Sequence, residues 1–358
     1  MDIVKATEDY ESWLEQRIPL IGADLKQKHA AMAEQPFAFF RATFYRWSQV
    51  WPEVSPETAA APHVLGVGDL HVENFGTWRD IEGRLIWGIN DFDEVCRLPY
   101  TCDLVRLATS AHLAIHAEHL TVPPGKGCDA ILEGYRDGLR SGKPFVLAEH
   151  HPALRQMAVE RLKQPEAFWE KMNALKTWKG RMPSSAMKAM RRALPGRDLD
   201  HRVVHRISGL GSLGRRRFVA LADWHSGSIA REAKELAESA WFWAWPRKRA
   251  AKIYYQDALD AARRCPDPFV FLRGRWIVRR LAPDCSRIEL SSLPKKHDSF
   301  RLLHAMGFET ANVHLGSAEP REIEADLKRR RPGWLHATAK IMAASVEADW
   351  KAWRKRRR

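Results

Sequence analysis

The sequence predicts an α+β fold in two parts, a larger one that is mostly helical and a smaller one built on an antiparallel β-sheet. Apolar residues recur every three to four positions near both ends of the chain, which is the spacing of amphipathic helices. Over residues 203–223 apolar and polar residues instead alternate on both sides of a glycine turn, which is typical of a β-hairpin. The chain has 358 residues, too many for one simple core, so we expect two lobes.

The composition is that of an ordinary globular protein. Hydrophobic residues make up 45% of the chain and charged residues 28%, which excludes a disordered chain, a collagen and a continuous coiled coil. The first residues are acidic and polar, so no signal peptide is expected. The most apolar helical stretch, residues 104–120, is broken by an arginine and three histidines and falls short of the roughly 20 apolar residues that span a bilayer. We therefore expect a soluble, cytoplasmic protein.

The cysteines carry no metal or disulfide signature. Their number is odd and no CxxC pair occurs, which excludes a disulfide framework and a zinc ribbon and indicates reduced thiols. They are Cys96, Cys102, Cys128, Cys265 and Cys285.

The helical segments follow from the spacing of their apolar residues. Residues 7–51 are expected to be helical, with Pro52 and Pro56 ending the stretch, and a further helix is expected over residues 101–119. Residues 128–195 are expected to be mostly helical, and two helices are expected after residue 291, the last of them from Trp334. The first segment has one aromatic face, which consists of Phe37, Phe40, Phe44 and Trp47.

Short apolar runs with turn residues at their ends indicate strands. Residues 63–70 and 83–94 are predicted to be neighbouring strands whose ends bring Asp69 and Asp91 close together. A further strand is expected over residues 273–282.

Two polar motifs follow these expected strands. In the run GDLHVEN, Asp69 is suited to accept the proton of an attacking hydroxyl, and the amide oxygen of Asn74 can ligate Mg²⁺. In the run NDFDE, the carboxylate of Asp91 is a hard oxygen ligand of the kind that Mg²⁺ binds, with Asp93 beside it. Either aspartate alone could simply form a turn, but the two motifs about twenty residues apart favour a joint function.

A glycine turn, SGLGSLG, begins about 140 residues after Asp69. Glycines in a hairpin let backbone N–H groups approach phosphate oxygens without a Cβ in the way, although such a turn alone is most often a plain tight turn. A lysine on the strand after a glycine hairpin, here Lys234, can pair with the phosphates of ATP; the alternative is a surface lysine. A strand follows this turn and GxxxxGK[ST] is absent, so a Rossmann loop and a Walker A motif are excluded.

Taken together, GDLHVENFG and INDFDE resemble the catalytic core of the aminoglycoside phosphotransferase and protein-kinase-like superfamily. More closely, the chain is similar to the bacterial domain-of-unknown-function family 2252 over most of residues 28–290. The runs that carry this resemblance are PFAFFRAT (36–43), GDLHVENFGTW (68–78), GRLIWGINDFDEV (83–95), CDLVRLATS (102–110), SGLGSLGRRRFVAL (208–221) and EAKEL (232–236).

The resemblance implies a protein-kinase-like, two-lobe fold with a permuted lobe order, because the glycine turn precedes the catalytic loop in kinases and follows it here. The expected parts are a mostly helical catalytic lobe over residues 1–195 and a small β-rich nucleotide-binding lobe over residues 196–290. Residues 291–358 are expected to form C-terminal helices that pack on the catalytic lobe and end in a basic tail.

The resemblance also implies a role for each motif. Asp69 resembles the catalytic aspartate, and Lys234 resembles the lysine that anchors ATP. The expected metal ligands are Asn74, Asp91 and Asp93, and the expected phosphate-covering residues are Gly209, Gly211, Ser212 and Gly214. The implied cofactors are ATP and Mg²⁺, and the implied acceptor is a hydroxyl of an unidentified small molecule or protein.

Several departures from the kinase pattern keep alternatives open. The His-Arg-Asp form of the catalytic loop is missing, Asp93 stands where kinases have a glycine, and no glutamate partner of Lys234 is assigned, although Glu235 and Glu238 are near in sequence. The alternatives are an enzyme that transfers AMP and a nucleotide-binding protein without turnover.

The basic C-terminal segment suggests a different class of function. Residues 328–358 carry a net charge of +9 of the chain's +14, beside several tryptophans, so they could bind nucleic acid. Trp350 and Trp353 are three residues apart, however, which is the spacing of a packing stripe on a helix. We therefore favour a solvated helix end over a nucleic-acid-binding surface.

Overall fold

The computed structural model describes residues 2–147, 151–152, 154–155, 165–196, 198–246, 251–285 and 298–356. These residues form the mixed α+β fold that the sequence predicts. The helices are α1 (Ile3–Glu15), α2 (Gly22–Glu34), α3 (Pro36–Ala42), α4 (Phe44–Val54), α5 (Pro56–Ala59), α6 (Tyr100–His116), α7 (Pro124–Ser141), α10 (Pro165–Asn173), α11 (Ser184–Arg191), the 3₁₀ turn η1 (Leu210–Ser212), α12 (Trp241–Ala244), α13 (Tyr255–Ala261), α14 (Ser299–His314), α15 (Pro320–Arg329) and α16 (Trp334–Arg356). The strands are β1 (His63–Gly66), β2 (Phe75–Arg79), β3 (Leu85–Ile89), β4 (Cys96–Pro99), β5 (Phe145–Val146), β6 (Arg202–His205), β7 (Arg217–Trp224), β8 (Gly227–Glu235), β9 (Phe271–Arg273) and β10 (Trp276–Leu281).

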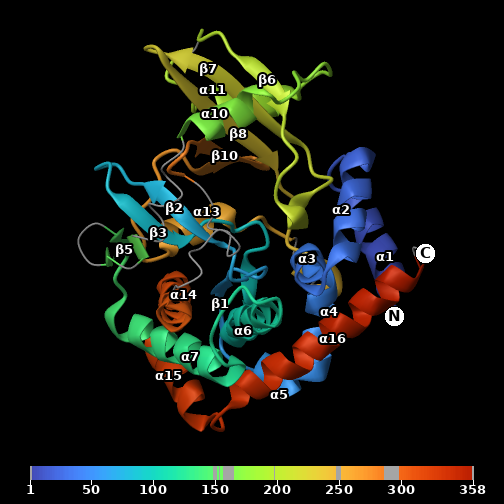
Figure 1. Cartoon of the computed structure of the whole chain (residues 1–358), viewed down its shortest axis with the longest axis vertical. Coiled ribbons are helices and arrows are strands. Elements are labelled where there is room, and N and C mark those ends of the chain that lie inside the picture. The colour runs from blue at the N-terminus through green and yellow to red at the C-terminus, as the bar shows by residue number, and fades with distance from the viewer. Residues whose placement is uncertain are drawn as a thin grey trace.

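A five-stranded antiparallel sheet forms one end of the molecule (Figure 1). Its strand order is β6-β7-β8-β10-β9, and each strand pairs antiparallel with its neighbours. The predicted hairpin is confirmed, because β6 and β7 flank the glycine turn and pair from Arg202 opposite Leu221 to His205 opposite Phe218. The strand expected over residues 273–282 is confirmed as β10.

The helices α10 and α11 pack on this sheet rather than on the other helices. Ala186, Ala189 and Met190 of α11 share an apolar cluster with Phe218 and Trp276 of the sheet. Met172 of α10 packs in a second cluster against β6 and β7. The five-stranded sheet thus gains its apolar cover from residues that we expected in the helical lobe, while the division of the chain at residues 195 and 290 stays a prediction.

The stretch over residues 7–51 is mostly helical as expected, but the structure divides it into four helices, and Pro52 does not end the last of them. Gln35 is extended before Pro36, which occupies the first turn of α3, and Thr43 breaks the helical path between α3 and α4. Pro52 lies inside α4, which ends at Val54, and Pro56 begins α5. Proline is tolerated in the first turn of a helix, where its missing N–H has no helical partner. Pro36 and Pro56 can therefore each begin a new helix.

The expected pairing of the strands around the two polar motifs is also wrong. The strand β1 pairs with β4, whereas β3 pairs with β2 and β5 in a separate sheet. The reason is local: β2 and β3 are joined by the short turn at residues 80–84 and form a hairpin, which leaves β1 to pair with the next strand along the chain.

The helical end of the molecule is built around α6. This helix is buried over most of its length and packs against α7, α14 and α16, and it corresponds to the helix expected over residues 101–119. The last helix, α16, begins at Trp334 as expected. Trp353 near its end is buried and donates a hydrogen bond from Nε1 to the carbonyl oxygen of His29 at 3.3 Å. The tryptophans of the basic segment therefore include one that packs into the core.

The described cysteines are all free thiols, of which Cys96, Cys102 and Cys128 are buried. Within the described part of the chain, no helix has the length and apolar character needed to cross a membrane.

Candidate functional site

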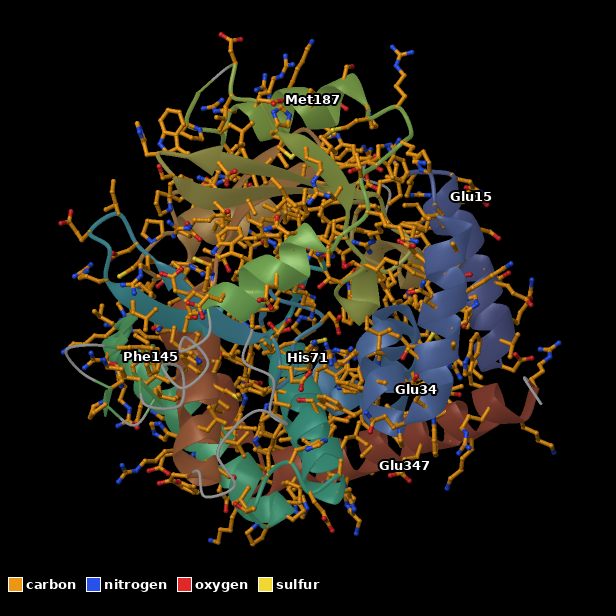
Figure 2. All side chains as sticks on the ribbon, turned by 45° about the horizontal axis from the view of Figure 1, so that its top comes forward. Glu15, Glu34, His71, Phe145, Met187 and Glu347 are labelled. Carbon is orange, nitrogen blue, oxygen red and sulfur yellow. The ribbon has the colours of Figure 1, made fainter. Side chains whose placement is uncertain are left out.

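A polar cleft lies where the glycine turn meets the two polar motifs. It holds about 570 Å³ of space, the part open to solvent included, and its walls come from the N-terminal helices, from the GDLHVEN and NDFDE runs and from the glycine turn. His71, one of the residues that line it, lies near the centre of the molecule (Figure 2). The predicted site residues that line this cleft are Asp69, Asn74, Asp91, Asp93, Gly209, Gly211 and Ser212.

The backbone just before Asp69 is held by α6. The carboxylate of Asp103 accepts hydrogen bonds from the N–H groups of Val67 at 2.6 Å and of Gly68 at 2.8 Å. Gly68 has a φ of +79°, and a Cβ there would lie 2.5 Å from the carbonyl oxygen of Glu94. A glycine is therefore required at this position, both by its backbone angle and by the close approach of the NDFDE segment.

Asp69 is held by a buried arginine. Its Oδ1 accepts hydrogen bonds from Nε of Arg106 at 3.1 Å and from Nη2 of the same guanidinium. Arg106 is fully buried on α6, with its guanidinium 4.0 Å from the ring centroid of Phe40. Burial raises the pKa of Asp69 to about 6, although the charge of Arg106 opposes this rise. A carboxylate whose pKa lies close to neutral pH is well suited to accept a proton from a substrate.

Asn74 joins the two motifs. Its Nδ2 donates a hydrogen bond to the carbonyl oxygen of Asp69 at 2.9 Å, and its own carbonyl oxygen accepts one from the N–H of Asn90 at 3.1 Å. These bonds bring Asp91 beside Asp69 even though β1 and β3 belong to different sheets. The Oδ1 atom of Asn74 accepts no hydrogen bond from the residues that the structure describes, so this oxygen is available to a ligand.

Lys234 lies in β8, as the strand interpretation of its segment predicts, and reaches the acids of NDFDE. Its Nζ lies 2.5 Å from both carboxylate oxygens of Asp93 and 3.6 Å from Oδ1 of Asp91. Burial lowers the pKa of Lys234 and raises the pKa of Asp93, which the neighbouring charge of Asp91 raises further. The carboxylate partners of this lysine are therefore aspartates. Of the two glutamates considered for that role, Glu235 pairs with Arg216 and Glu238 with Arg17.

The glycine turn approaches the GDLHVEN motif most closely at Gly211. A Cβ at this position would lie 3.0 Å from the carbonyl oxygen of Arg41 and 3.2 Å from Oδ2 of Asp69. Ser212 does not point freely into the cleft, because its Oγ accepts a hydrogen bond from Nη2 of Arg217 at 2.9 Å. Gly209 has a φ of +77°, so the turn depends on glycine there as well.

Gly214 is the one predicted residue of the turn that faces elsewhere. Its carbonyl oxygen accepts a hydrogen bond from the N–H of Ile21 at 2.8 Å, and a Cβ on it would lie 2.5 Å from Cδ2 of Leu25. Gly214 thus lets the turn pack against α2, and it does not line the cleft.

Four cationic side chains were not predicted as site residues: Lys28, Arg41 and Arg215 line the cleft, and Arg106 holds Asp69 from behind it. Arg106 and Arg41 interrupt apolar helical faces, and an arginine in such a place is almost always paired, so the pattern could have revealed both. Lys28 and Arg215 lie among polar residues and gave no such signal. Arg41 pairs with Glu73 at 2.5 Å and Arg215 pairs with Glu94 at 2.7 Å.

Lys28 differs from the other three because it has no counter-ion. It is 3% exposed, its Nζ lies 3.4 Å from the carbonyl oxygen of Gly211, and it makes no salt bridge with any described residue. The ring centroid of Tyr45 is 5.8 Å away. Burial lowers the pKa of Lys28. Because a buried cation without a counter-ion is costly, the cleft is suited to an anionic group at this point.

The residues present fit a Mg²⁺ ion that a substrate helps to bind. Among the described residues, no group of three or more His, Cys, Asp or Glu side chains is arranged to hold a metal ion. Mg²⁺ often needs fewer protein ligands, because it binds through one or two carboxylates together with substrate phosphates. Asp91 and Oδ1 of Asn74 offer oxygen atoms of this kind in the cleft, whereas both carboxylate oxygens of Asp93 contact Lys234.

One protein-family model matches the part of the chain that contains the GDLHVEN and NDFDE motifs. Residues 20–192 match the family model described as uncharacterized protein conserved in bacteria (DUF2252). This match supports the resemblance of residues 20–192 to the DUF2252 family. The matched region includes Asp69, Asn74 and Asp91 and ends before β6, so the glycine turn and Lys234 lie beyond it. No curated protein and no solved structure matches the chain.

Proposed function

We propose that the cleft is the active site of a Mg²⁺- and ATP-dependent phosphotransferase that acts on a hydroxyl group of a small molecule or a protein. The observation that carries this proposal is the meeting of Asp69 and Asp93 at one cleft under a glycine turn, with Lys234 in contact with Asp93 behind the lining of the cleft. Lys234 follows Asp93 by 141 positions, so this meeting is a product of the fold and not of sequence proximity. A simple structural ion pair would need neither the base-like Asp69 nor the turn beside it.

The arrangement of the five-stranded sheet supports a kinase-like interpretation. The glycine turn joins its first two strands, and the third strand carries the lysine, which is the order of parts in the small lobe of protein kinases. In this chain that lobe would follow the catalytic motifs, so the lobe order would be permuted.

Each residue of the cleft has a role in the proposed reaction. Lys234 would bind phosphate oxygens of ATP, and the backbone around Gly211 would approach them closely. When bound at Asn74 and Asp91, Mg²⁺ would neutralise the charge of the phosphates. Asp69 would orient the acceptor hydroxyl and take its proton, because a carboxylate with a pKa of about 6 is mostly ionised at neutral pH.

The uncompensated charge of Lys28 gives independent support for an anionic substrate. Its ammonium group lies against the carbonyl oxygen of Gly211, in the turn that would cover the phosphates. A phosphate oxygen would supply the counter-ion that the described residues do not provide.

The test is to identify what the protein makes from ATP. The purified protein is incubated with ATP and Mg²⁺, and the nucleotides are separated by anion-exchange chromatography. Because water can take the place of the acceptor, slow formation of ADP and phosphate is expected without any added acceptor. Asp69→Asn should lower this rate by about 10²-fold or more, since the base is removed. Asp257→Asn is the matched control, because Asp257 pairs with Lys252 at the surface.

Other results would contradict the proposal or indicate a different function. An unchanged rate of ADP formation in Asp69→Asn would contradict the role of this aspartate. The products AMP and pyrophosphate would indicate an enzyme that transfers AMP. ATP that binds and stays intact would indicate a nucleotide-binding protein without turnover.

A further inference from the structure

A second cavity lies behind the NDFDE segment. It holds about 690 Å³ of space, the part open to solvent included, between β2, α13 and β10. Asn90 and Phe92 line this cavity, whereas Asp91 and Asp93 line the cleft described above. Alternate residues of one segment therefore face two different spaces. The side chains that characterise the second cavity are Trp78, Phe92, Tyr255, Arg264, Arg279 and Arg280.

Arg264 is stacked between aromatic rings and lacks a counter-ion. Its guanidinium carbon lies 4.3 Å from the ring centroid of Trp78 and 5.2 Å from that of Phe92. Nη1 donates a hydrogen bond to the carbonyl oxygen of Ile89 at 2.9 Å, and the buried Nε has no hydrogen-bond partner. The side chain makes no salt bridge within the described part of the chain. Nη1 of this arginine is thus held by the backbone, whereas Nε and Nη2 donate no hydrogen bond to a described residue.

The two other arginines of the cavity already have carboxylate partners. Nε of Arg279 donates to Glu232 at 2.7 Å, and Arg280 lies 3.8 Å from Oδ1 of Asp267. The buried Nε of Arg280 also lacks a hydrogen-bond partner. Of the three arginines that line the cavity, Arg264 is thus the one without a salt bridge to a described residue.

The nearby acids make no salt bridge with Arg264 within the described part of the chain. Asp260, which also lines the cavity, accepts a hydrogen bond from Nε2 of Gln256 at 2.7 Å. Glu309 does not line the cavity and accepts a hydrogen bond from the N–H of Ile89 at 3.3 Å. Burial raises the pKa of Glu309 to about 7, so this group holds only part of a negative charge at neutral pH.

We propose that this cavity binds a small organic anion, a carboxylate carried on a flat apolar group. The planar fork of an arginine matches the two oxygens of a carboxylate, and Arg264 has donors to spare. Trp78, Phe92 and Tyr255 are among the residues that line the cavity, and aromatic side chains are surfaces against which a flat group packs well. A single arginine without a salt bridge suits a singly charged carboxylate better than a doubly charged phosphate.

Benzoate is the probe for this site and benzamide its uncharged counterpart of the same shape. We expect ligand-observed NMR titrations to show that the protein binds benzoate with a dissociation constant of about 1 mM or lower. Benzamide should bind at least about tenfold more weakly, which corresponds to the loss of one charge-assisted contact. Inorganic phosphate at the same concentration should leave benzoate bound.

Variants locate the bound benzoate. Arg264→Gln should weaken benzoate binding by about tenfold or more, and Arg264→Lys, which keeps the charge and loses the fork, should weaken it as well. Lys234→Met alters the cleft on the other side of the segment, and benzoate binding should be unchanged in it. Arg264→Lys preserves the buried charge, so it serves as the test if Arg264→Gln does not fold.

Four results would each overturn the proposal. They are equal binding of benzoate and benzamide, no benzoate binding at millimolar concentration, full binding in both Arg264 variants, and loss of binding in Lys234→Met. Displacement of benzoate by phosphate would also contradict the choice of a carboxylate and would assign the cavity to phosphate compounds.

Discussion

Asp69 has an environment that determines how the proposed reaction should depend on pH. Burial raises its pKa to about 6, and a base must be ionised to accept a proton. We therefore predict that the rate of ADP formation is constant at and above neutral pH and falls as the pH drops through about 6. Initial rates measured between about pH 5 and pH 8 check this prediction. A rate that does not change across this range would mean that Asp69 is not the base.

Lys28 should lower the free energy of unfolding of the protein while it increases the affinity for MgATP. Replacing this buried, unpaired cation by methionine should raise the free energy of unfolding by about 1 kcal/mol at neutral pH. The pKa of Lys28 in the folded state is lowered from 10.5, so the gain should shrink as the pH rises toward that value, where the lysine is neutral in both states.

Chemical denaturation of Lys28→Met beside Lys252→Met, in which an exposed lysine is removed, measures this effect. In the same variant the affinity for MgATP should fall by about tenfold if Lys28 contacts a phosphate. A Lys28→Met protein that is less stable than the wild type would show that the lysine already has a stabilising partner.

Single residues were predicted from the sequence where their chemistry is written into a short motif. Asp69, Asn74 and Asp91 belong to such motifs, and the structure brings all three to the cleft. Lys28 carries no local signal, because its importance comes from its having no salt bridge with any residue that the structure describes. Gly214 has the same residue type as Gly211, yet only the fold decides that it faces α2 instead of the cleft.

At the scale of elements, the contact between α7 and α14 depends on small residues. A Cβ on Gly134 of α7 would lie 1.8 Å from the carbonyl oxygen of His304, whereas a Cβ on Gly125 of the same helix would meet nothing closer than Nδ1 of His336 at 3.4 Å. Gly134→Ala should therefore lower the free energy of unfolding by roughly 1–3 kcal/mol, because the two helices must move apart.

Gly125→Ala is the matched control, since alanine is a better helix former than glycine and has room at this position. Thermal or chemical denaturation of the two variants gives the comparison. Equal stability of Gly134→Ala and Gly125→Ala would contradict the close packing of α7 against α14.

Elements were predicted well where their pattern is local and poorly where their partners are distant. The hairpin of β6 and β7 and the helices α6 and α16 follow from periodicity and turn residues. The pairing of β1 with β4 could not be predicted, because it depends on which strand is left over once β2 and β3 form their own hairpin. The N-terminal aromatic stretch has helical periodicity throughout, but Pro36 and Thr43 divide its path.

At the scale of the whole molecule, the mixed α+β fold was predicted. The sequence also predicted that Asp91 and Asp93 of NDFDE and Lys234 belong to one site. In the structure Nζ of Lys234 lies 2.5 Å from both carboxylate oxygens of Asp93 and 3.6 Å from Asp91. The cavity behind NDFDE was not predicted. Its walls come from β2, α13 and β10, and no sequence pattern states that three such distant segments enclose a space.

The central claim is that the cleft binds a magnesium nucleotide, and isothermal titration calorimetry with MgATP tests it most directly. We predict saturable binding that requires Mg²⁺ and is lost in Lys234→Met and Asp91→Asn, while Lys252→Met, at an exposed lysine, binds as the wild type does. Wild-type protein that binds no nucleotide, or a Lys234→Met variant that binds MgATP as tightly as the wild type, would contradict the account.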